Sequence, residues 1–382
     1  MQRIFQFAVS ILAALALSGP AFALDHVTLR YHGKQTKVTG RVLVSAQDGG
    51  LLLLARDGVI WTVQPDDLVE HVKDDQPFEP LMAEEMGPRV LAELPAGFDV
   101  YRTAHYVICY NTSRDYAQWC GLLLERLHLA FTNFWSRRGF SLKTPEFPLT
   151  AIVFADQQSY EAFSRTELGD AVRAIIGYFS LRSNRMTMFD LTGVATLGRS
   201  GRGTTAAQIN RILSQPEAER MVATIVHEAT HQIAFNCGLH NRYSDCPLWF
   251  SEGIALYFET PDVSGAKGGS SAVGTVNRSR LARFNEYLRQ RPKDSLVTLI
   301  RDDKRLRDTK QGLDAYAEAW ALTYFLLKQH PKQYIAYLKT LSAKEPMRWD
   351  DPEARLREFQ QAFGDDLAKL DAEMVRYMLR LR

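Results

Sequence analysis

The first part of the chain has the apolar and polar pattern of short β-strands. Between 27 and 71, apolar runs such as "LLLLA" and "VIWTV" alternate with turn residues, including Asp-Gly pairs at 48–49 and 57–58. Such an arrangement is typical of β-hairpins. We therefore expect a small β-barrel-like module over 24–75, with a packing or interaction role because it has no cluster of catalytic residue types. The charged, proline-containing stretch over 76–97 is typical of a linker.

Strand and helix patterns alternate in the next part of the chain. "DVYRTAHYVICY" (99–110) and "PLTAIVFAD" (148–156) each have the pattern of a buried strand. The segment "YAQWCGLLLERLHLAFTNFWSRRG" between them has apolar residues at helical spacing, with Gly139 as its stop. "AIIGYFSLRSNRMTMFD" (174–190) has the pattern of a hairpin. These segments predict a mixed α/β layer.

A long helix is predicted between Ser214 and Gly238. Ser214 followed by Glu217 is a capping-box pattern, and glycine is a natural stop at the end of a helix. One side of this helix is apolar, through Val222, Ile225, Val226, Ala229 and Ile233. From 278 to 382 the pattern is helical almost throughout, so the chain as a whole is expected to be α+β.

The N-terminus resembles a secretory signal peptide. A basic residue, Arg3, precedes the apolar run 4–17, and Ser18-Gly19-Pro20 interrupts it before the small-x-small sequence Ala21-Phe22-Ala23. Cleavage after Ala23 is the expectation, since the run is short for a membrane span; an uncleaved anchor is the alternative. No second apolar stretch approaches spanning length, so we expect a soluble periplasmic or secreted protein without a stable membrane span.

Composition narrows the possible partners. The 382 residues are 46% hydrophobic and 24% charged, which is usual for a folded protein with a core. The formal net charge of +2 gives no electrostatic case for binding nucleic acid or an acidic membrane surface. The oligomeric state stays open.

Export would place the four cysteines in an oxidising compartment. Sequence-local pairing, Cys109 with Cys120 and Cys237 with Cys246, is the simplest of the three possible connectivities. The alternative for the second pair is metal binding together with His240.

Candidate chemistry lies on the long helix, in "TIVHEATHQIAF". His227 and His231 are four residues apart, so they project from one side of the helix and can converge on one ion. Glu228 is rotated by about 100° and would lie beside that ion. This is the H-E-x-x-H arrangement, in which two imidazoles bind Zn²⁺ and the glutamate acts on a bound water. The alternative is an amphipathic helix with two surface histidines.

A third zinc ligand is available in "CPLWFSEGIALYFE". Pro247 suits the first turn of a second helix, and Glu252 would point inward from otherwise apolar surroundings. A carboxylate in such a place is costly without a partner, and a zinc ion would be that partner. Gly253 would allow close backbone approach beside the site.

The two motifs together resemble the gluzincin clan of zinc metallopeptidases. The clan includes thermolysin-like and aminopeptidase-N-like families, and its second motif is similar to "WFSEGIA" here. The layout over about 98–380, with the later helix "YAEAWALTYFLL" (316–327), also resembles secreted bacterial gluzincin-like proteins classed as a domain of unknown function. The resemblance implies a zincin-like subdomain over 98–238 with a mixed sheet and the metal helix. It further implies a mainly helical subdomain over 239–382 that carries the third ligand.

The resemblance also implies roles for individual residues. His227, His231 and Glu252 would bind Zn²⁺, and Glu228 would be the general base. Tyr316 resembles the tyrosine that stabilises the oxyanion in the clan; a purely packing role is its alternative. Tyr243 and His240 are weaker candidates for the oxyanion role.

The clan binds extended peptide along an edge strand, for which "RMTMFD" (185–190) is the candidate. Asn277 and Arg280 could contact substrate, although a surface or helix-cap role is favoured. The glycine–alanine–methionine–glutamate–asparagine motif of the aminopeptidases is absent from the sequence. A disulfide between Cys237 and Cys246 would restrain the loop between the metal helices.

Two functions are compatible with these features. The first is an exported zinc metallopeptidase that acts on peptides or proteins. The second is a catalytically inactive, zinc-bound scaffold that binds peptide or cell-wall material. Retention of Glu228 favours the enzyme, because a scaffold has no need of a base. The sequence does not indicate the substrate or distinguish endo- from exopeptidase action.

Overall fold

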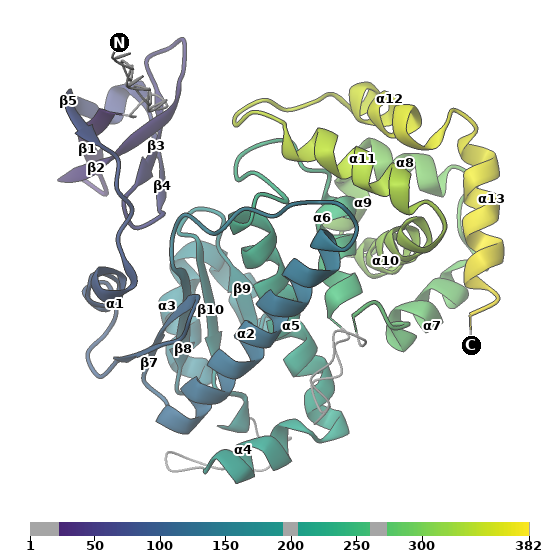
Figure 1. The fold of residues 1–382 in the computed structure, drawn as a ribbon, viewed down its shortest axis with the longest axis horizontal. Coiled ribbons are helices and arrows are strands. Elements are labelled where there is room, and N and C mark those ends of the chain that lie inside the picture. The colour runs from purple at the N-terminus through teal and green to yellow at the C-terminus, as the bar shows by residue number, and fades with distance from the viewer. Residues whose placement is uncertain (1–22, 194–204, 260–272, 382) are drawn as a thin grey trace, which may run out of the picture. The chain divides into compact units, whose positions relative to one another are not determined.

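The structure is a computed structural model that describes residues 23–193, 205–259 and 273–381 (Figure 1). The segment 1–22, which carries almost all of the predicted signal peptide, lies outside the described residues. The described chain forms two compact units: residues up to Arg56 with Thr62–Glu79, and Asp57–Trp61 with the chain from Pro80 onward.

The first unit contains one antiparallel sheet with the strand order β4-β3-β2-β1-β5. The expected barrel is therefore wrong, because the sheet is open and β4 and β5 form its two edges. Its strands are β1 (Ala23–Tyr31), β2 (Lys34–Ser45), β3 (Leu51–Ala55), β4 (Ile60–Val63) and β5 (Leu68–Pro77), with a 3₁₀ turn at Pro65–Asp67.

The expected linker over 76–97 contains a helix, α1 (Ala83–Leu91). Met86 and Val90 on its inner face are buried in the core of the second unit. Gly87 lies against Val100 so closely that an added Cβ would come within 3.1 Å of the valine methyl groups. This packing makes α1 an integral part of the second unit.

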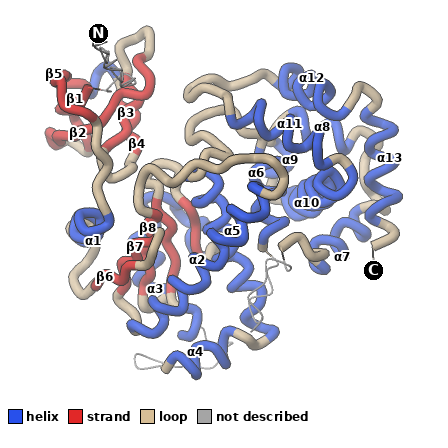
Figure 2. The backbone as a smooth tube through the Cα atoms, in the orientation of Figure 1, coloured by secondary structure: helices blue, strands red, loops and turns tan. Residues whose placement is uncertain are grey.

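The second sheet, whose strands β6, β7 and β8 are labelled in Figure 2, is mixed. Its strand order is β6-β7-β8-β10-β9. The central strands β7, β8 and β10 are parallel, and β6 and β9 are antiparallel edges. Its strands are β6 (Asp99–Arg102), β7 (Tyr106–Tyr110), β8 (Leu149–Phe154), β9 (Gly177–Phe179) and β10 (Arg185–Phe189). The prediction of one strand over 99–110 is wrong, because a turn closed by the Thr103 N–H and the Tyr106 carbonyl divides it.

The proposed substrate strand at 185–190 is also wrong as an edge strand. It corresponds to β10, which is paired on both sides, with β8 and with β9. Its backbone donors and acceptors are therefore already engaged. The edge next to it is β9, which runs along α5 (Pro216–Asn236).

Helices cover this sheet and form the rest of the second unit. In Figure 1, α2 and α5 run side by side across the sheet, and they pack on each other and on its strands. Between α1 and the second candidate motif, the helices are α2 (Arg114–Ser136), α3 (Gln157–Leu168), α4 (Ala206–Leu213) and α5, with 3₁₀ turns at Gly169–Ala174 and Leu191–Gly193.

The C-terminal part is helical, as the sequence pattern predicts. Its helices are α6 (Leu248–Phe258), α7 (Arg278–Tyr287), α8 (Ser295–Arg301), α9 (Lys304–Arg307), α10 (Gly312–Gln329), α11 (Pro331–Ser342), α12 (Pro352–Phe363) and α13 (Leu367–Met378). Trp135, Trp249 and Trp320 from three different helices are fully buried in one continuous core. Within the described ranges, the structure has no helix with the length and apolarity needed to cross a membrane.

Helix α5 does not begin with the capping box predicted from Ser214 and Glu217. Ser214 ends α4, and α5 begins with Pro216 after Gln215, whose side chain makes no capping hydrogen bond. Proline is compatible with the first turn because its missing N–H would have no partner there. The predicted end is close to the observed one, since Gly238 has a φ of 77° directly after Cys237.

The two predicted disulfides are absent, because all four cysteines are free. Cys237 lies beside His128, with its Sγ 4.0 Å from the ring Nε2, whereas Cys246 Sγ lies 3.6 Å from His240 Nδ1. Cys109 belongs to β7 and Cys120 to α2, and both are fully buried. Closeness along the chain therefore does not bring either pair of thiols together.

Candidate metal centre

Helices α5 and α6 bring the three predicted ligands together; we call His227, His231 and Glu252 the α5–α6 cluster. His227 Nε2 lies 3.0 Å from Glu252 Oε2 and 3.3 Å from His231 Nε2. His231 Nε2 lies 3.5 Å from Glu252 Oε1. One ligand atom from each residue thus lies within 4.8 Å of the others, a spacing compatible with a shared metal ion.

The approach of α6 to its neighbour α10 depends on Gly253. A Cβ at this position would lie 2.1 Å from Thr323 Oγ1 and 2.9 Å from the Ala319 carbonyl oxygen. No side chain fits there without displacing α10. The glycine next to Glu252 therefore determines how closely α6 approaches α10, and with it the position of the third candidate ligand.

A further acidic residue, Glu259, supports the cluster from the end of α6. Its Oε2 lies 3.2 Å from Nδ1 of His227, the ring nitrogen opposite the one that faces Glu252. Asn277 Nδ2 donates to Glu259 Oε1 at 2.8 Å, and Arg280 Nε lies 3.4 Å from the same oxygen. A carboxylate in this place fixes which nitrogen of a ligating imidazole carries the proton.

Asn277 also caps α7 by accepting the Arg280 N–H, which agrees with the favoured cap role. Asn277 and Arg280 therefore act on Glu259 rather than lying free at the surface. Sequence reasoning missed Glu259, although a signal was present: Glu252 and Glu259 are seven residues apart, which places them on one face of a helix.

Glu228 lies beside the cluster and outside the ligand set. Its Oε2 accepts the backbone N–H of Phe179, the last residue of edge strand β9, at 2.9 Å. Burial raises the pKa of Glu228 above its usual range, although the nearby His227 and His231 act in the opposite direction. A partly desolvated carboxylate next to a metal position is suited to accept and return a proton.

The charged groups of the α5–α6 cluster favour a cation between them. Burial lowers the pKa of His227, but hydrogen bonds to Glu252 and Glu259 outweigh this effect and raise it to about 10. Burial raises the pKa of Glu252, but His231 and His227 outweigh burial and hold it well below its usual range. The buried carboxylates therefore require a positive charge between them, and His227 carries it as a proton when no metal is bound.

Tyr316 is the first of the three residues predicted for the oxyanion role. Tyr316 lies in the second turn of α10, and burial together with the charges of Glu252 and Glu228 raises the pKa of its phenol. Among the predicted oxyanion residues, Tyr316 is the one whose pKa is affected by both Glu252 and Glu228.

His240 and Tyr243 are engaged elsewhere. His240 is buried between Phe235 and Phe250, and burial, with a contribution from His231, lowers its pKa to about 3. Tyr243 is half-buried with a φ of 60°, and its carbonyl accepts the Met347 N–H. The suggested metal site of His240 with both neighbouring cysteines is wrong, since Cys237 lies beside His128.

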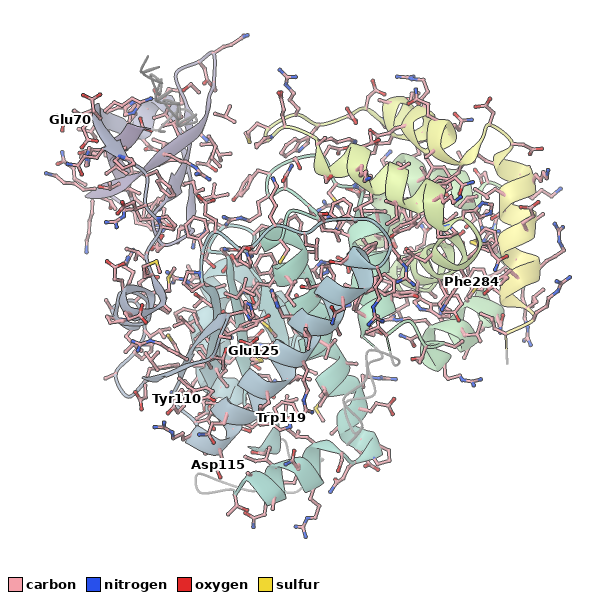
Figure 3. All side chains as sticks on the ribbon, viewed as in Figure 1. Glu70, Tyr110, Asp115, Trp119, Glu125 and Phe284 are labelled. Carbon is pink, nitrogen blue, oxygen red and sulfur yellow. The ribbon has the colours of Figure 1, made fainter. Side chains whose placement is uncertain are left out.

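A second group of possible metal ligands consists of His105, Glu125 and His128, and we call it the α2 cluster. Glu125 lies on α2, where Figure 3 labels it. This group was not predicted from the sequence, although Glu125 and His128 have a spacing that places them on one helix face.

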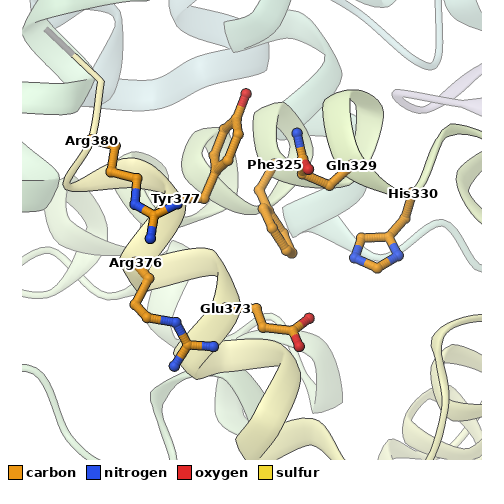
Figure 4. Close-up of a pocket in the computed structure, with 7 residues that line it drawn as sticks. All are labelled: Phe325, Gln329, His330, Glu373, Arg376, Tyr377 and Arg380. Atoms are coloured by element: carbon orange, nitrogen blue, oxygen red, sulfur yellow. The ribbon is translucent and has the colours of Figure 1, made fainter.

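A surface pocket of about 320 Å³ lies between the end of α10 and α13 (Figure 4). It contains none of the predicted site residues. Its walls combine basic and acidic side chains, and none of them belongs to a group of possible metal ligands among the described residues. Its lining residues are Phe325, Gln329, His330, Glu373, Arg376, Tyr377 and Arg380.

Comparison with known proteins adds one match. No curated protein matches the chain. Residues 221–348, which include the α5–α6 cluster, Glu228, Glu259 and Tyr316, match the model of a family described as a protein of unknown function (DUF1570).

Proposed function

We propose that this protein is an exported zinc metallopeptidase of the gluzincin type, acting on peptides or proteins in the periplasm or outside the cell. The observation that carries the proposal is the convergence of His227, His231 and Glu252, with Glu228 adjacent to them and outside the ligand set. Two imidazoles and one carboxylate form a donor set suited to catalytic zinc, which keeps one position for water.

Bound zinc would supply a Lewis acid that polarises the scissile carbonyl and acidifies the attacking water. Glu228 would take the proton from this water and pass it to the leaving amine, and its raised pKa favours the first of these two transfers. Glu259 would keep the His227 proton on Nδ1, leaving Nε2 free as the ligand atom. Tyr316 would donate a hydrogen bond to the developing oxyanion.

Edge strand β9 is suited to align an extended substrate with these groups. Phe179 donates its N–H to Glu228, so the end of β9 is fixed relative to the general base. A peptide could add to the outer side of β9, since β10 occupies the inner side. This replaces 185–190 as the proposed substrate strand.

The test of hydrolysis is the substitution Glu228→Gln, assayed on a mixed peptide library with purified, zinc-loaded protein. Removing the base should lower the rate by about 10²- to 10⁴-fold while zinc content stays the same. Glu219→Gln, an exposed position on the same helix, is the matched control and should keep full activity. If wild type cleaves no peptide and Glu228→Gln is indistinguishable from it, the enzyme proposal fails and the zinc-bound scaffold remains.

Metal analysis tests the centre itself. The purified protein should contain zinc at this site. His231→Ala should lose this zinc, because only two of the three protein ligands remain. A wild-type protein without zinc, whose stability is unaffected by chelation, would contradict both the enzyme and the scaffold.

A further inference from the structure

The α2 cluster joins three parts of the second unit. His105 lies in the turn between β6 and β7, and its carbonyl accepts the N–H of Leu149 at the start of β8. Glu125 and His128 lie one turn apart on α2. His128 is also adjacent to Cys237, which ends α5. The cluster therefore lies where the sheet, α2 and the end of the candidate metal helix meet.

The ligand atoms of this cluster are already close together. One atom each from His105, Glu125 and His128 lies within 4.8 Å of the others. Glu125 Oε2 lies 2.7 Å from His105 Nδ1, while Oε1 accepts hydrogen bonds from Thr103 Oγ1 and the His105 backbone N–H. The two hydrogen bonds to Oε1 hold the carboxylate in place, as they would for a ligand oriented by its surroundings.

The polar groups of the cluster suit a cation. The His128 ring is buried, and its Nε2 lies 4.0 Å from Cys237 Sγ, so no carboxylate occupies this ring nitrogen. Burial raises the pKa of Glu125, but bonds from Thr103 and His105 outweigh it and keep the group ionised. Tyr106, which directly follows His105, is buried, and its hydroxyl has no hydrogen-bond partner.

One rearrangement is required for metal binding. The rings of His105 and His128 are stacked, with centroids 4.0 Å apart and an interplanar angle of 26°. An imidazole binds a metal in the plane of its ring, so two stacked rings cannot point their lone pairs at one ion. The His105 side chain is 40% exposed and can turn out of the stack, whereas His128 is held in the core.

We propose that His105, Glu125 and His128 bind a second divalent cation of the zinc type, which fastens α2 to the β6–β7 turn near the end of α5. Two imidazoles and a carboxylate select a borderline cation such as Zn²⁺ over Mg²⁺ or Ca²⁺, which prefer oxygen ligands. Water would complete the ligand set, because three side chains leave one position of a four-coordinate zinc ion open. This site does not depend on the proposed peptidase activity.

The experiment is a zinc titration by equilibrium dialysis of the purified chain after removal of metal by a chelator. Wild type should bind about two equivalents, and His231→Ala and His105→Ala about one each. The double variant His231→Ala/His105→Ala should bind almost none. Zinc should also raise the thermal midpoint of His231→Ala but not that of the double variant.

Two further variants guard against misinterpretation. Glu125→Gln removes the charge of the ligand with little change in shape, and it should lose the same equivalent as His105→Ala. His32→Asn removes an exposed imidazole in the β1–β2 turn while keeping a side chain that tolerates its φ of 49°, and it should still bind two equivalents.

The outcomes separate the two sites. If His231→Ala binds no zinc and gains no thermal stability from it, the second site does not exist while the first stands. If wild type binds one equivalent that survives in His231→Ala and disappears in His105→Ala, the α2 cluster binds metal and the proposed catalytic centre fails. Equal stoichiometry in wild type and His105→Ala overturns the present inference.

Discussion

The two histidine–glutamate clusters have the same ligand types but opposite proton occupancy. In the α5–α6 cluster, bonds to Glu252 and Glu259 outweigh burial and raise the pKa of His227 to about 10. In the α2 cluster, burial and the neighbouring His105 lower the pKa of His128 to about 4. At neutral pH and without metal, the first buried ring is therefore a cation and the second is neutral.

The difference follows from how the carboxylates are arranged. Two carboxylates bond directly to opposite nitrogens of the His227 ring, whereas Glu125 bonds to His105 and leaves His128 without an acidic hydrogen-bond partner. The α5–α6 cluster is thus built around a positive charge that is present with or without metal. The α2 cluster has free lone-pair capacity but must give up the contact between His105 and Glu125 to bind an ion, so we expect weaker zinc binding there.

The largest difference between the two clusters should be in catalysis, and the substitution Tyr316→Phe tests it through kcat. If its hydroxyl stabilises an oxyanion, its loss should lower kcat by about 10²- to 10³-fold. Zinc content should stay the same, because Tyr316 is not a candidate ligand. Steady-state kinetics on a peptide substrate measure this, with Tyr324→Phe on the same helix as control. An unchanged kcat would reduce Tyr316 to a packing residue.

A smaller effect is expected from Glu259→Gln, which leaves the ligands intact. Without the carboxylate, Nδ1 of His227 loses its charged acceptor, so zinc affinity should fall by about 10- to 100-fold. Competition with a chromogenic chelator measures the change, and Glu286→Gln on α7 is a surface control. If the affinity for zinc does not change, the α5–α6 cluster does not depend on the Glu259 carboxylate. The difference in charge between the two clusters would then not be due to Glu259.

Much of the α5–α6 cluster could be predicted from local sequence. The spacing of His227 and His231 fixes their shared direction on a helix, and Glu252 stands out as a charge among apolar neighbours. Glu259 carries a similar local signal two turns later. The Phe179 amide had no such signal, because a backbone donor becomes visible only when long-range pairing places β9 at the sheet edge.

Long-range pairing also explains where the predicted fold was wrong. The apolar runs of the first unit fix strands but not whether the two edge strands meet, so an open sheet and a barrel have the same local pattern. The α2 cluster was missed because His105 reaches α2 only through the β6–β7 turn. Likewise, Cys237 is close to Cys246 in sequence but lies beside His128.

The acid stability of the metal-free protein should depend on His128. Its pKa is about 4 in the folded chain against an ordinary 6.5, so the unfolded chain binds the proton first. The free energy of unfolding should therefore fall by about 2 to 3 kcal/mol as the pH drops from 6.5 to 4. Urea unfolding across this range should show the fall in wild type and a flatter profile in His128→Gln. Equal slopes would mean that His128 is not held neutral.

The smallest effect should be that of Glu125, at lower pH. Its pKa is lowered in the folded chain, so its bonds to Thr103 and His105 stabilise the protein above the ordinary value of 4.5 and are lost as the pH falls below it. Glu125→Gln should therefore cost about 1 kcal/mol at pH 6, and this difference from wild type should shrink toward pH 3. Glu70→Gln, an exposed position of β5 that Figure 3 also labels, is the matched control and should change little at either pH. A Glu125→Gln penalty that is the same at both values would show that shape rather than charge holds the α2 cluster together, and would remove the reason for expecting a cation there.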